Sequence, residues 1–361
     1  MTTGNNNCYM GYAAGNQTAT GWNNTFMGYA AGYMNTTGEQ NVFFGNSSGY
    51  ANMTRSYNTY TSLNSGVNNS TGNYNAMYGF SAGTSNTAWF NTFVGAHAGE
   101  YNTSGGYNTF IGRWAGYKNT TGAYNTYLGH DAGFNNSTGG GNTYLGYYAG
   151  FNNTMGGFNT ILGFDAGHNT QGDKNVFVGT YAGYNETGSN KLYIENTSIS
   201  SPLIWGDFTT DQLVFNGKVG IQKAGPTHML DVGASGAYCD GGVWVDGSSR
   251  TYKDHIVTLT AKEAVAAFKG LEPVKYNYKD DHEEMHVGFI AEDVPDLVAT
   301  KDRKGLSPMD IVAVLTRVVQ EQQKVVQEQQ KVIQDQQEIN LNQQKLIKEV
   351  EKRLETLEKK R

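Results

Sequence analysis

A 17-residue repeat dominates the first half of the sequence. Three consecutive copies, from Tyr117 to Gly167, read YKNTTGAYNTYLGHDAG, FNNSTGGGNTYLGYYAG and FNNTMGGFNTILGFDAG. About eleven copies run from near the N-terminus to Gly183, with single-residue contractions near Ala88 and Gly172. A unit this short cannot bury a core alone, so its copies have to stack on one another.

The repeat follows the pattern aromatic-x-Asn-x-Thr-Gly-x-x-Asn-Thr-aromatic-aliphatic-Gly-x-x-Ala-Gly. Such a unit is too short for a helix–turn–helix and suits one coil of a β-solenoid or β-roll. Stacked strands lie about 4.8 Å apart, so eleven coils would form a rod segment of about 50 Å. We expect the glycines to supply corner conformations closed to other residues. We also expect the second asparagine of the pattern to form an inward ladder of amide hydrogen bonds. It recurs at Asn7, Asn24, Asn41, Asn58, Asn75, Asn91, Asn108, Asn125, Asn142, Asn159 and Asn175.

The short strand within each coil has large apolar residues on both faces. Side chains alternate along a strand, so threonine and the aliphatic residue share one face while the aromatic residue takes the other. This predicts burial on both faces, the second of them between subunits of a trimer. The alternative is that the aromatic residues fill a wider single-chain core. We interpret the threonines as a ladder inside the fold. The fourth copy departs from the pattern, with Thr61 and Ser62 in the aliphatic and glycine slots.

The Asn-Thr-x-aliphatic-Gly coil resembles the head repeats of trimeric autotransporter adhesins, a likeness that covers roughly half of the chain. It implies a trimeric β-roll and leaves the handedness of these longer coils open. Aromatic residues also recur in the first slot of the pattern, at Tyr101, Tyr117, Phe134 and Phe151. They could stack on sugars, but packing within the fold is the favoured interpretation.

The segment from Leu192 to Asp246 no longer follows the repeat. It reads as short strands with turn signals: LYIEN, PLIWGDF, DQLVFNGKVGI and MLDVGASGAYCDGGVWVDG. The part from Gly217 to Val232 resembles the β-rich necks that precede chaperone domains in tail fibres. We interpret the whole segment as connecting structure.

Candidate catalytic residues occur in the segment GSSRTYKD, residues 247–254. Ser248 stands five positions before Lys253. A serine hydroxyl is a weak nucleophile and needs a nearby base. A lysine amine is that base only when burial or nearby positive charge favours its neutral form. On spacing alone, this stretch is more typical of a solvated loop.

The blocks that follow change this interpretation. They read VTLTAKEAVAAFKGLEPVKYNY, VGFIAEDVPDLV and GLSPMDIVAVLTRVVQEQQKVV. In this order they resemble the intramolecular chaperone autoprocessing domain, found at the C-termini of phage endosialidases and other tail fibres and in myelin regulatory factor. The resemblance runs from Ser248 to Arg361 and implies Ser248 as nucleophile, Lys253 as general base and Gly247–Ser248 as the scissile bond. Ser249, four residues from the lysine, is the less favoured nucleophile. Such a domain is at most a single-turnover serine autoprotease with no outside substrate.

Helix signals mark the rest of this region. Thr260 and Glu263 form a capping box, and Gly270 ends the short helix that it starts. We expect an apolar face on that helix from Ala264, Val265 and Phe268. Ser307 and Pro308 are an N-cap and a first-turn proline for a final helix over about 308–361.

The final helix carries a heptad repeat. One seam position holds Val312, Val319, Val326, Ile333, Asn340, Ile347 and Leu354. The other holds Leu315, Gln322, Gln329, Gln336, Gln343, Val350 and Leu357. β-Branched residues with a buried asparagine are typical of coiled coils, and four glutamines make the seam weak, as suits a transient clamp. Alternatively, the helices splay and pack a second stripe against the fibre: Val318, Val325, Val332, Ile339 and Leu346.

Composition excludes several function classes. Up to Gly247 there are 7 Lys+Arg and 12 Asp+Glu, and from Ser248 there are 19 and 20, so neither part is basic and nucleic acid is not expected as a partner. Two cysteines, Cys8 and Cys239, cannot make a disulfide framework, and no His/Cys cluster has metal-ligand spacing. No run of residues is long enough to span a membrane. The repeats contain few carboxylates, of which Asp131 and Asp165 share a slot two coils apart, and this argues against glycoside hydrolysis.

We therefore predict a mainly β trimer with three regions. These are a β-solenoid over residues 1–191, a β-rich neck over 192–247, and a small α+β chaperone domain over 248–361 that ends in a long coiled-coil-like helix. The predicted function is a tail-fibre or adhesin-like fibre that binds a host or another surface, through a receptor or glycan. Its chaperone domain assists trimer assembly and cleaves itself. The alternative is a cell-surface adhesin or capsid-decorating fibre that retains the chaperone uncleaved. We expect no cofactor, attachment to a larger particle or an upstream fibre segment, and a location on a virion or an extracellular surface.

Overall fold

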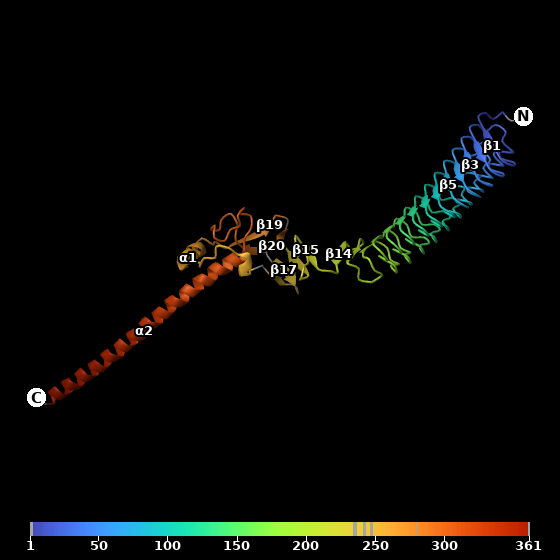
Figure 1. The fold of residues 1–361 in the computed structure, drawn as a ribbon. Coiled ribbons are helices and arrows are strands. Elements are labelled where there is room, and N and C mark those ends of the chain that lie inside the picture. The colour runs from blue at the N-terminus through green and yellow to red at the C-terminus, as the bar shows by residue number, and fades with distance from the viewer. Residues whose placement is uncertain (1–2, 234–236, 241–242, 246–247, 280, 360–361) are drawn as a thin grey trace. The chain divides into compact units, whose positions relative to one another are not determined.

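Each repeat copy contributes one three-residue strand to a parallel stack (Figure 1). Neighbouring strands pair in register, residue for equivalent residue, as in Thr126 with Thr143. The strands are β1 (Cys8–Met10), β2 (Thr25–Met27), β3 (Val42–Phe44), β4 (Thr59–Thr61), β5 (Ala76–Tyr78), β6 (Thr92–Val94), β7 (Thr109–Ile111), β8 (Thr126–Leu128), β9 (Thr143–Leu145), β10 (Thr160–Leu162) and β11 (Val176–Val178). The predicted β-solenoid of about eleven coils is confirmed.

This computed structural model describes residues 3–233, 237–240, 243–245, 248–279 and 281–359 of the chain. The chain divides into two units, Met1–Ser248 and Ser249–Arg361, and each is taken by itself below. The solenoid belongs to the first unit, and the final helix to the second.

The core of the solenoid is a column of stacked aromatic rings. The middle residue of each strand points inward, and Phe110, Tyr127 and Tyr144 have no exposed surface. Successive ring centroids along these three lie 4.8 Å apart with nearly parallel planes. The alternative of aromatic residues inside a single-chain core is therefore what the coil adopts. Fully buried alanines from the Ala-Gly corner, such as Ala132, complete this core.

The threonines and aliphatic residues of the strands lie on the outer face. Thr126 is exposed, and Leu128 and Leu145 keep almost half of their surface. The interpretation of the threonines as an interior ladder was wrong, because the bulky aromatic residue between threonine and leucine takes the only interior that a coil has. One chain thus leaves an apolar sheet face uncovered.

The predicted asparagine ladder is inward and continuous, and Asn24 to Asn175 are fully or almost fully buried at this slot. Most of its bonds join side-chain amides to backbone groups and so differ from the expected amide-to-amide form, which occurs between Asn159 Nδ2 and Asn142 Oδ1 at 3.2 Å. The Nδ2 of Asn125 donates to the carbonyl of Gly139 at 2.9 Å, and its Oδ1 accepts from the backbone N–H of Asn142 at 2.9 Å. Each amide therefore ties the backbone of two coils together.

A second buried ladder comes from the first asparagine of the pattern. Here amides do bond to each other: Nδ2 of Asn119 donates to Oδ1 of Asn102 at 2.6 Å, and Nδ2 of Asn136 donates to Oδ1 of Asn119 at 3.0 Å. The members without exposed surface are Asn35, Asn52, Asn69, Asn86, Asn102, Asn119, Asn136 and Asn153.

The glycine after each strand permits close stacking. Gly28 has a φ of +135°, and a Cβ added there would lie 2.5 Å from the carbonyl oxygen of Gly45. A side chain at this slot therefore meets both an unfavourable backbone conformation and the next coil. Ser62 nevertheless occupies it in the fourth copy, with a φ of +109°.

The sheet continues beyond the last repeat. Strand β12 (Lys191–Ile194) pairs with β11 in parallel, and then β13 (Ile204–Asp207) and β14 (Gln212–Phe215) add in antiparallel order. An ion pair joins Lys191 Nζ and Asp207 Oδ2 at 2.6 Å across β12 and β13. This change of direction ends the stack of identical coils.

A second sheet of four strands follows in the order β15–β16–β17–β18. The strands are β15 (Val219–Ile221), β16 (Leu230–Val232), β17 (Ala237–Asp240) and β18 (Val243–Val245). Short strands with intervening turns thus occupy this part of the chain, as its sequence pattern indicates.

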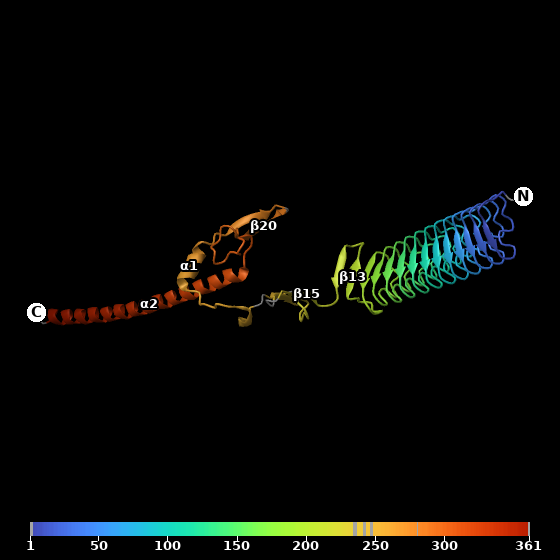
Figure 2. The same cartoon turned by 45° about the horizontal axis from the view of Figure 1, so that its top comes forward.

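The second unit is a small α+β structure with a long helix. It contains a 3-10 helix η1 (Arg250–Tyr252), helix α1 (Ala261–Lys269), an antiparallel pair β19 (Val274–Tyr278) and β20 (Asp281–Gly288), and helix α2 (Pro308–Glu358). Figure 2 shows α1 beside the beginning of α2. The 51-residue length of α2 confirms the predicted final helix.

Candidate functional site

The predicted cleavage segment joins the two units. Ser248 is the last residue of the first unit, and its side chain is exposed. Gly247, the predicted residue before the cut, lies outside the described residues. Lys253, the predicted base, follows η1 in the second unit and is also exposed.

Ser249 and the backbone of Lys253 form the hydrogen bonds that begin and close the 3-10 helix η1. The Oγ of Ser249 accepts from the backbone N–H of Thr251 at 3.3 Å and caps η1. The backbone N–H of Lys253 donates to the carbonyl of Arg250 at 3.2 Å and closes the same turn. Ser249 therefore serves as the cap of η1.

The capping signals that sequence indicates for α1 are present. Thr260 Oγ1 accepts from the N–H of Glu263 at 3.2 Å, and Glu263 Oε2 accepts from the N–H of Thr260 at 2.9 Å. Hydrogen bonds from the side chain and then the backbone of Thr260 lower the pKa of Glu263. The N–H of Gly270 caps the other end, as expected.

The face that α1 buries differs in part from expectation. Ala264 and Ala267 are buried, whereas Phe268 keeps 44% of its surface exposed. Ala264 and Ala267 pack with Val294, Val298, Val314 and Val318 in the core of the second unit. Phe268 was expected on this face, but within one chain it projects into an open groove instead.

The loop before α2 is held to the core by Arg303. Its guanidinium donates to the carbonyl of Val294 at 2.6 Å and to that of Glu292 at 2.8 Å, and it pairs with Asp296. Ser307 then caps α2 through the N–H of Asp310 at 3.3 Å, with Pro308 in the first turn. These contacts fix where the long helix begins.

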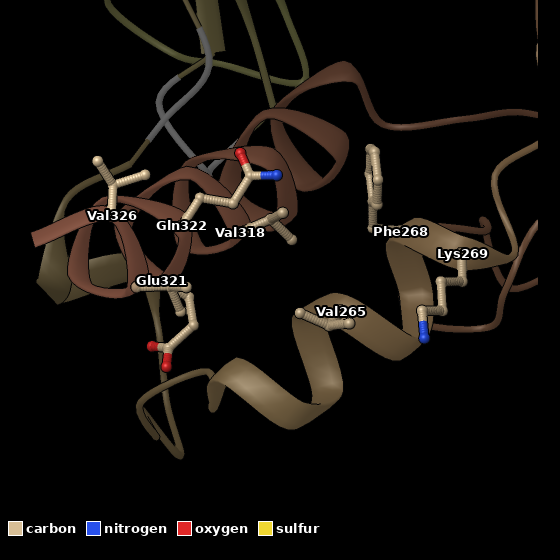
Figure 3. A pocket seen from close by; sticks show the side chains of 8 residues that line it. Val265, Phe268, Lys269, Val318, Glu321, Gln322 and Val326 are labelled. Atoms are coloured by element: carbon tan, nitrogen blue, oxygen red, sulfur yellow. The ribbon is translucent and has the colours of Figure 1, made fainter. Parts of the chain in front are cut away.

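A groove of about 510 Å³ lies between α1 and α2 (Figure 3). Val265 and Phe268 from α1 and Val318, Val325 and Val326 from α2 form its apolar lining. Lys269, Glu321 and Gln322 supply the polar lining. The groove is therefore an apolar surface with a polar border, which is the usual composition of a docking surface.

Beyond this groove α2 leaves both predicted stripes uncovered. Val314 and Val318 are its buried residues, and its later apolar residues are exposed. Exposed apolar members of the heptad seam are Val312, Leu315, Val319, Val326, Ile333, Ile347, Val350, Leu354 and Leu357. Exposed members of the second stripe are Val325, Val332, Ile339 and Leu346. A helix with this much uncovered apolar surface is typical of one that packs against another chain.

The comparison with protein families agrees with this architecture. Residues 248–301 match the family described as chaperone of endosialidase. This match and the solenoid fold together support a fibre with a C-terminal chaperone domain. No curated protein and no solved structure matches the chain.

Within the described residues, no group of three or more His, Cys, Asp and Glu side chains is placed to hold a metal ion. In the same part of the chain, no helix combines the length and the apolar character needed to cross a bilayer.

Proposed function

We propose that the chain forms a homotrimeric fibre that binds a host or another surface and whose C-terminal domain directs assembly and then cuts itself off. The observation that carries this is the uncovered apolar surface of α2 above a core that buries only its first turns. Such surface is costly in water and is removed when copies of the helix pack together. The exposed sheet face of the solenoid offers each chain a second contact along the fibre.

The proposed cut uses Ser248 and Lys253. The Lys253 amine takes the proton of the Ser248 hydroxyl, and Oγ forms a bond to the carbonyl carbon of Gly247. The bond from that carbon to the Ser248 nitrogen breaks, and the nitrogen takes up the proton. Water then hydrolyses the resulting ester, which frees the Gly247 carboxylate and restores the Ser248 hydroxyl. Each chain turns over once.

Both side chains are exposed in one chain. A lysine becomes a base when burial disfavours its charged form, and a second or third copy packed over this segment would supply that burial. Cleavage would then depend on completed assembly. The family match that begins at Ser248 supports this position for the start of the chaperone domain.

Denaturing gels with intact-mass measurement test the cut in the wild type, Ser248→Ala and Lys253→Ala, with Ser249→Ala as the matched control. The wild type and the control should yield a fragment that ends at Gly247 and one that begins at residue 248, while the other two variants stay whole. Multi-angle light scattering on the same samples should give a trimer. A monomer at micromolar concentration contradicts the assembly proposal, and a trimer that stays whole contradicts the cleavage proposal.

The alternative is a cell-surface adhesin or capsid-decorating fibre with its chaperone retained. An uncleaved trimer would favour it. Electron microscopy of the native source separates the two locations, a virion tail fibre and an extracellular surface fibre.

A further inference from the structure

Five consecutive coils place an aromatic ring at a corner that does not require one. The slot before the repeat asparagine is left-handed throughout. Phe158 fills it in a later coil, and the remaining coils carry Asn6, Asn23, Gln40, Gly141 or Lys174. Bulky residues suit this conformation least. The five rings, stacked with centroids 4.7 to 5.1 Å apart and at least 40% exposed, are Tyr57, Tyr74, Phe90, Tyr107 and Tyr124. Their conformational cost and exposure point to a role at the surface.

Trp89 lies beside this column but outside the stack. Its ring is inclined by 64° to that of Phe90, with centroids 6.3 Å apart. Its Nε1 donates to the carbonyl of Thr71 at 2.8 Å, which fixes the indole, yet 47% of the residue is exposed. Trp89 therefore presents an aromatic surface of fixed orientation to solvent.

A groove of about 470 Å³ adjoins this indole. The two coils after Trp89 carry Gly106 and Ala123 in its slot, and both line the groove. A Cβ at Gly106 would lie 3.1 Å from the carbonyl oxygen of Trp89 and would come within 4 Å of no side chain. The space beside the indole is therefore open because these residues are small.

The remaining lining residues combine rings and hydroxyls: Tyr107 and Tyr124 with Thr71, Thr87 and Ser104. No lining residue is charged. The Thr71 and Thr87 hydroxyls donate to the carbonyls of Thr87 and Thr103 at 2.6 and 2.9 Å, which leaves their oxygens able to accept. The faces of aromatic rings are electron-rich and attract polarised C–H groups.

We propose that this groove binds a neutral glycan, with one sugar ring packed on Trp89 and its hydroxyls bonded to Thr71, Thr87 and Ser104. Sugar rings present C–H faces and hydroxyl edges, which match this lining. An acidic ligand such as nucleic acid fits poorly, because the chain up to residue 247 has 7 Lys+Arg against 12 Asp+Glu. This inference deepens the surface-binding part of the proposed function and rests on it.

The chain contains a matched control for Trp89. Trp22 occupies the same slot of an earlier coil and is 42% exposed. Trp22 is followed by Asn23, whereas Trp89 is followed by Phe90 of the aromatic column. In the coil after Trp22, Glu39 occupies the slot that Gly106 occupies in the coil after Trp89. Trp22 thus has the indole without the uncharged groove.

The test uses the full-length chain on an array of hexasaccharides: neutral glucans, mannans, galactans and N-acetylhexosamine oligomers, with polygalacturonate and polysialate as acidic probes. Wild type and Trp22→Ala should bind at least one neutral probe. Trp89→Ala should reduce that binding at least tenfold. Gly106→Glu should do the same, and the solenoid should tolerate it because Glu39 occupies this slot in another coil.

Binding to no neutral probe, or neutral binding that survives both Trp89→Ala and Gly106→Glu, overturns the proposal. A preference for acidic probes also overturns it. Light scattering and intact mass on the same samples report assembly and cleavage, so failure of the glycan site is distinguishable from failure of the proposed assembly. Far-ultraviolet circular dichroism confirms that the variants are folded.

Discussion

Ser62 occupies the backbone conformation that the other coils give to glycine, with a φ of +109°. A residue with a Cβ in this region is strained by about 1–3 kcal/mol. Glycine loses more conformational freedom on folding, which offsets about 0.5–1 kcal/mol. We expect Ser62→Gly to stabilise the solenoid by about 1 kcal/mol, measured as a higher midpoint of chemical unfolding.

The control for Ser62 is Ser104→Gly, an exposed serine without a positive φ. It should be neutral or slightly destabilising, because there glycine relieves no strain. If both changes have the same effect, backbone strain at Ser62 is not the cause.

Asn125 tests the buried ladder. Asn125→Leu removes the bond to the carbonyl of Gly139 and leaves the N–H of Asn142 without its acceptor. Unpaired buried polar groups cost about 1–3 kcal/mol each, so we expect a loss of roughly 2–5 kcal/mol. Asn68→Leu, at an exposed asparagine, should change stability by less than about 0.5 kcal/mol. Equal losses in denaturant titrations of the two variants would show that the ladder contributes no special stability.

At the scale of the strands, the aromatic column makes the solenoid sensitive to alkali. Desolvation by burial raises the pKa of Tyr60, Tyr127 and Tyr144 above the ordinary value. Because the folded pKa is raised, stability is fully present below the unfolded pKa of about 10 and is lost as pH rises toward the folded pKa. The unfolded chain ionises in this window while the buried hydroxyls stay neutral.

Replacing the three buried tyrosines with phenylalanine should therefore reduce the loss of thermal stability between pH 9 and pH 11. Phenylalanine fits, since Phe43 and Phe110 occupy the same slot. Tyr12→Phe with Tyr29→Phe, at exposed positions, should leave the loss unchanged. Melting curves at both pH values measure this loss. An equal loss in the wild type, the triple variant and the control would contradict the prediction.

Periodicity alone predicts where strands begin and how coils stack, because both follow from spacing. It does not predict which face of the strand Asn-Thr-Tyr-Leu-Gly is interior. Alternation assigns side chains to two faces, and only the volume of the aromatic ring relative to the space inside one coil decides which face is buried. The amide-to-backbone bonding of Asn125 also needed coordinates, because a buried amide has several possible acceptors. The ladder through Asn119 could have been found from sequence, as this asparagine recurs with the same regularity.

The predicted dyad illustrates a different limit. Its residues come from family likeness and spacing, but in the proposed mechanism the burial that activates Lys253 comes from contacts with other copies. The groove at Trp89 was missed for a simpler reason. Its signal is a pair of small residues, Gly106 and Ala123, one and two coils after a tryptophan.

In the proposed trimer, the glutamines of α2 would determine how long the helices stay together. Gln322, Gln329 and Gln336 lie in the seam of the proposed trimer, where polar residues weaken packing. Replacing all three with leucine should keep the released C-terminal fragment trimeric at concentrations at least tenfold lower. Analytical ultracentrifugation of the cleaved protein measures this. Leucines at the exposed positions Gln320, Gln327 and Gln334 are the control and should leave the dissociation unchanged.

At the scale of the whole molecule, the coils and the chaperone belong to separate units. Deleting residues 118–134 removes one 17-residue period and rejoins equivalent positions of neighbouring coils. We expect this shortened chain to assemble and to cleave like the wild type. Deletion of residues 118–125 breaks the phase of the repeat and should abolish soluble trimer. Size-exclusion chromatography with intact mass compares the two, and equal behaviour would contradict a phase-dependent stack.

Because the coils are nearly identical and stack in register, their contacts do not determine which coil lies beside which. A stack that skipped one coil would reproduce the same asparagine bonds and the same ring contacts, so these contacts carry little information about which coil belongs beside which. Chain connectivity carries that information instead, since looping out a coil adds the entropy cost of closing a longer loop. The antiparallel turn through β13 and β14 occurs once in this sheet, so it marks a fixed origin. Counting coils from that end would let separate chains begin their stacks at the same position.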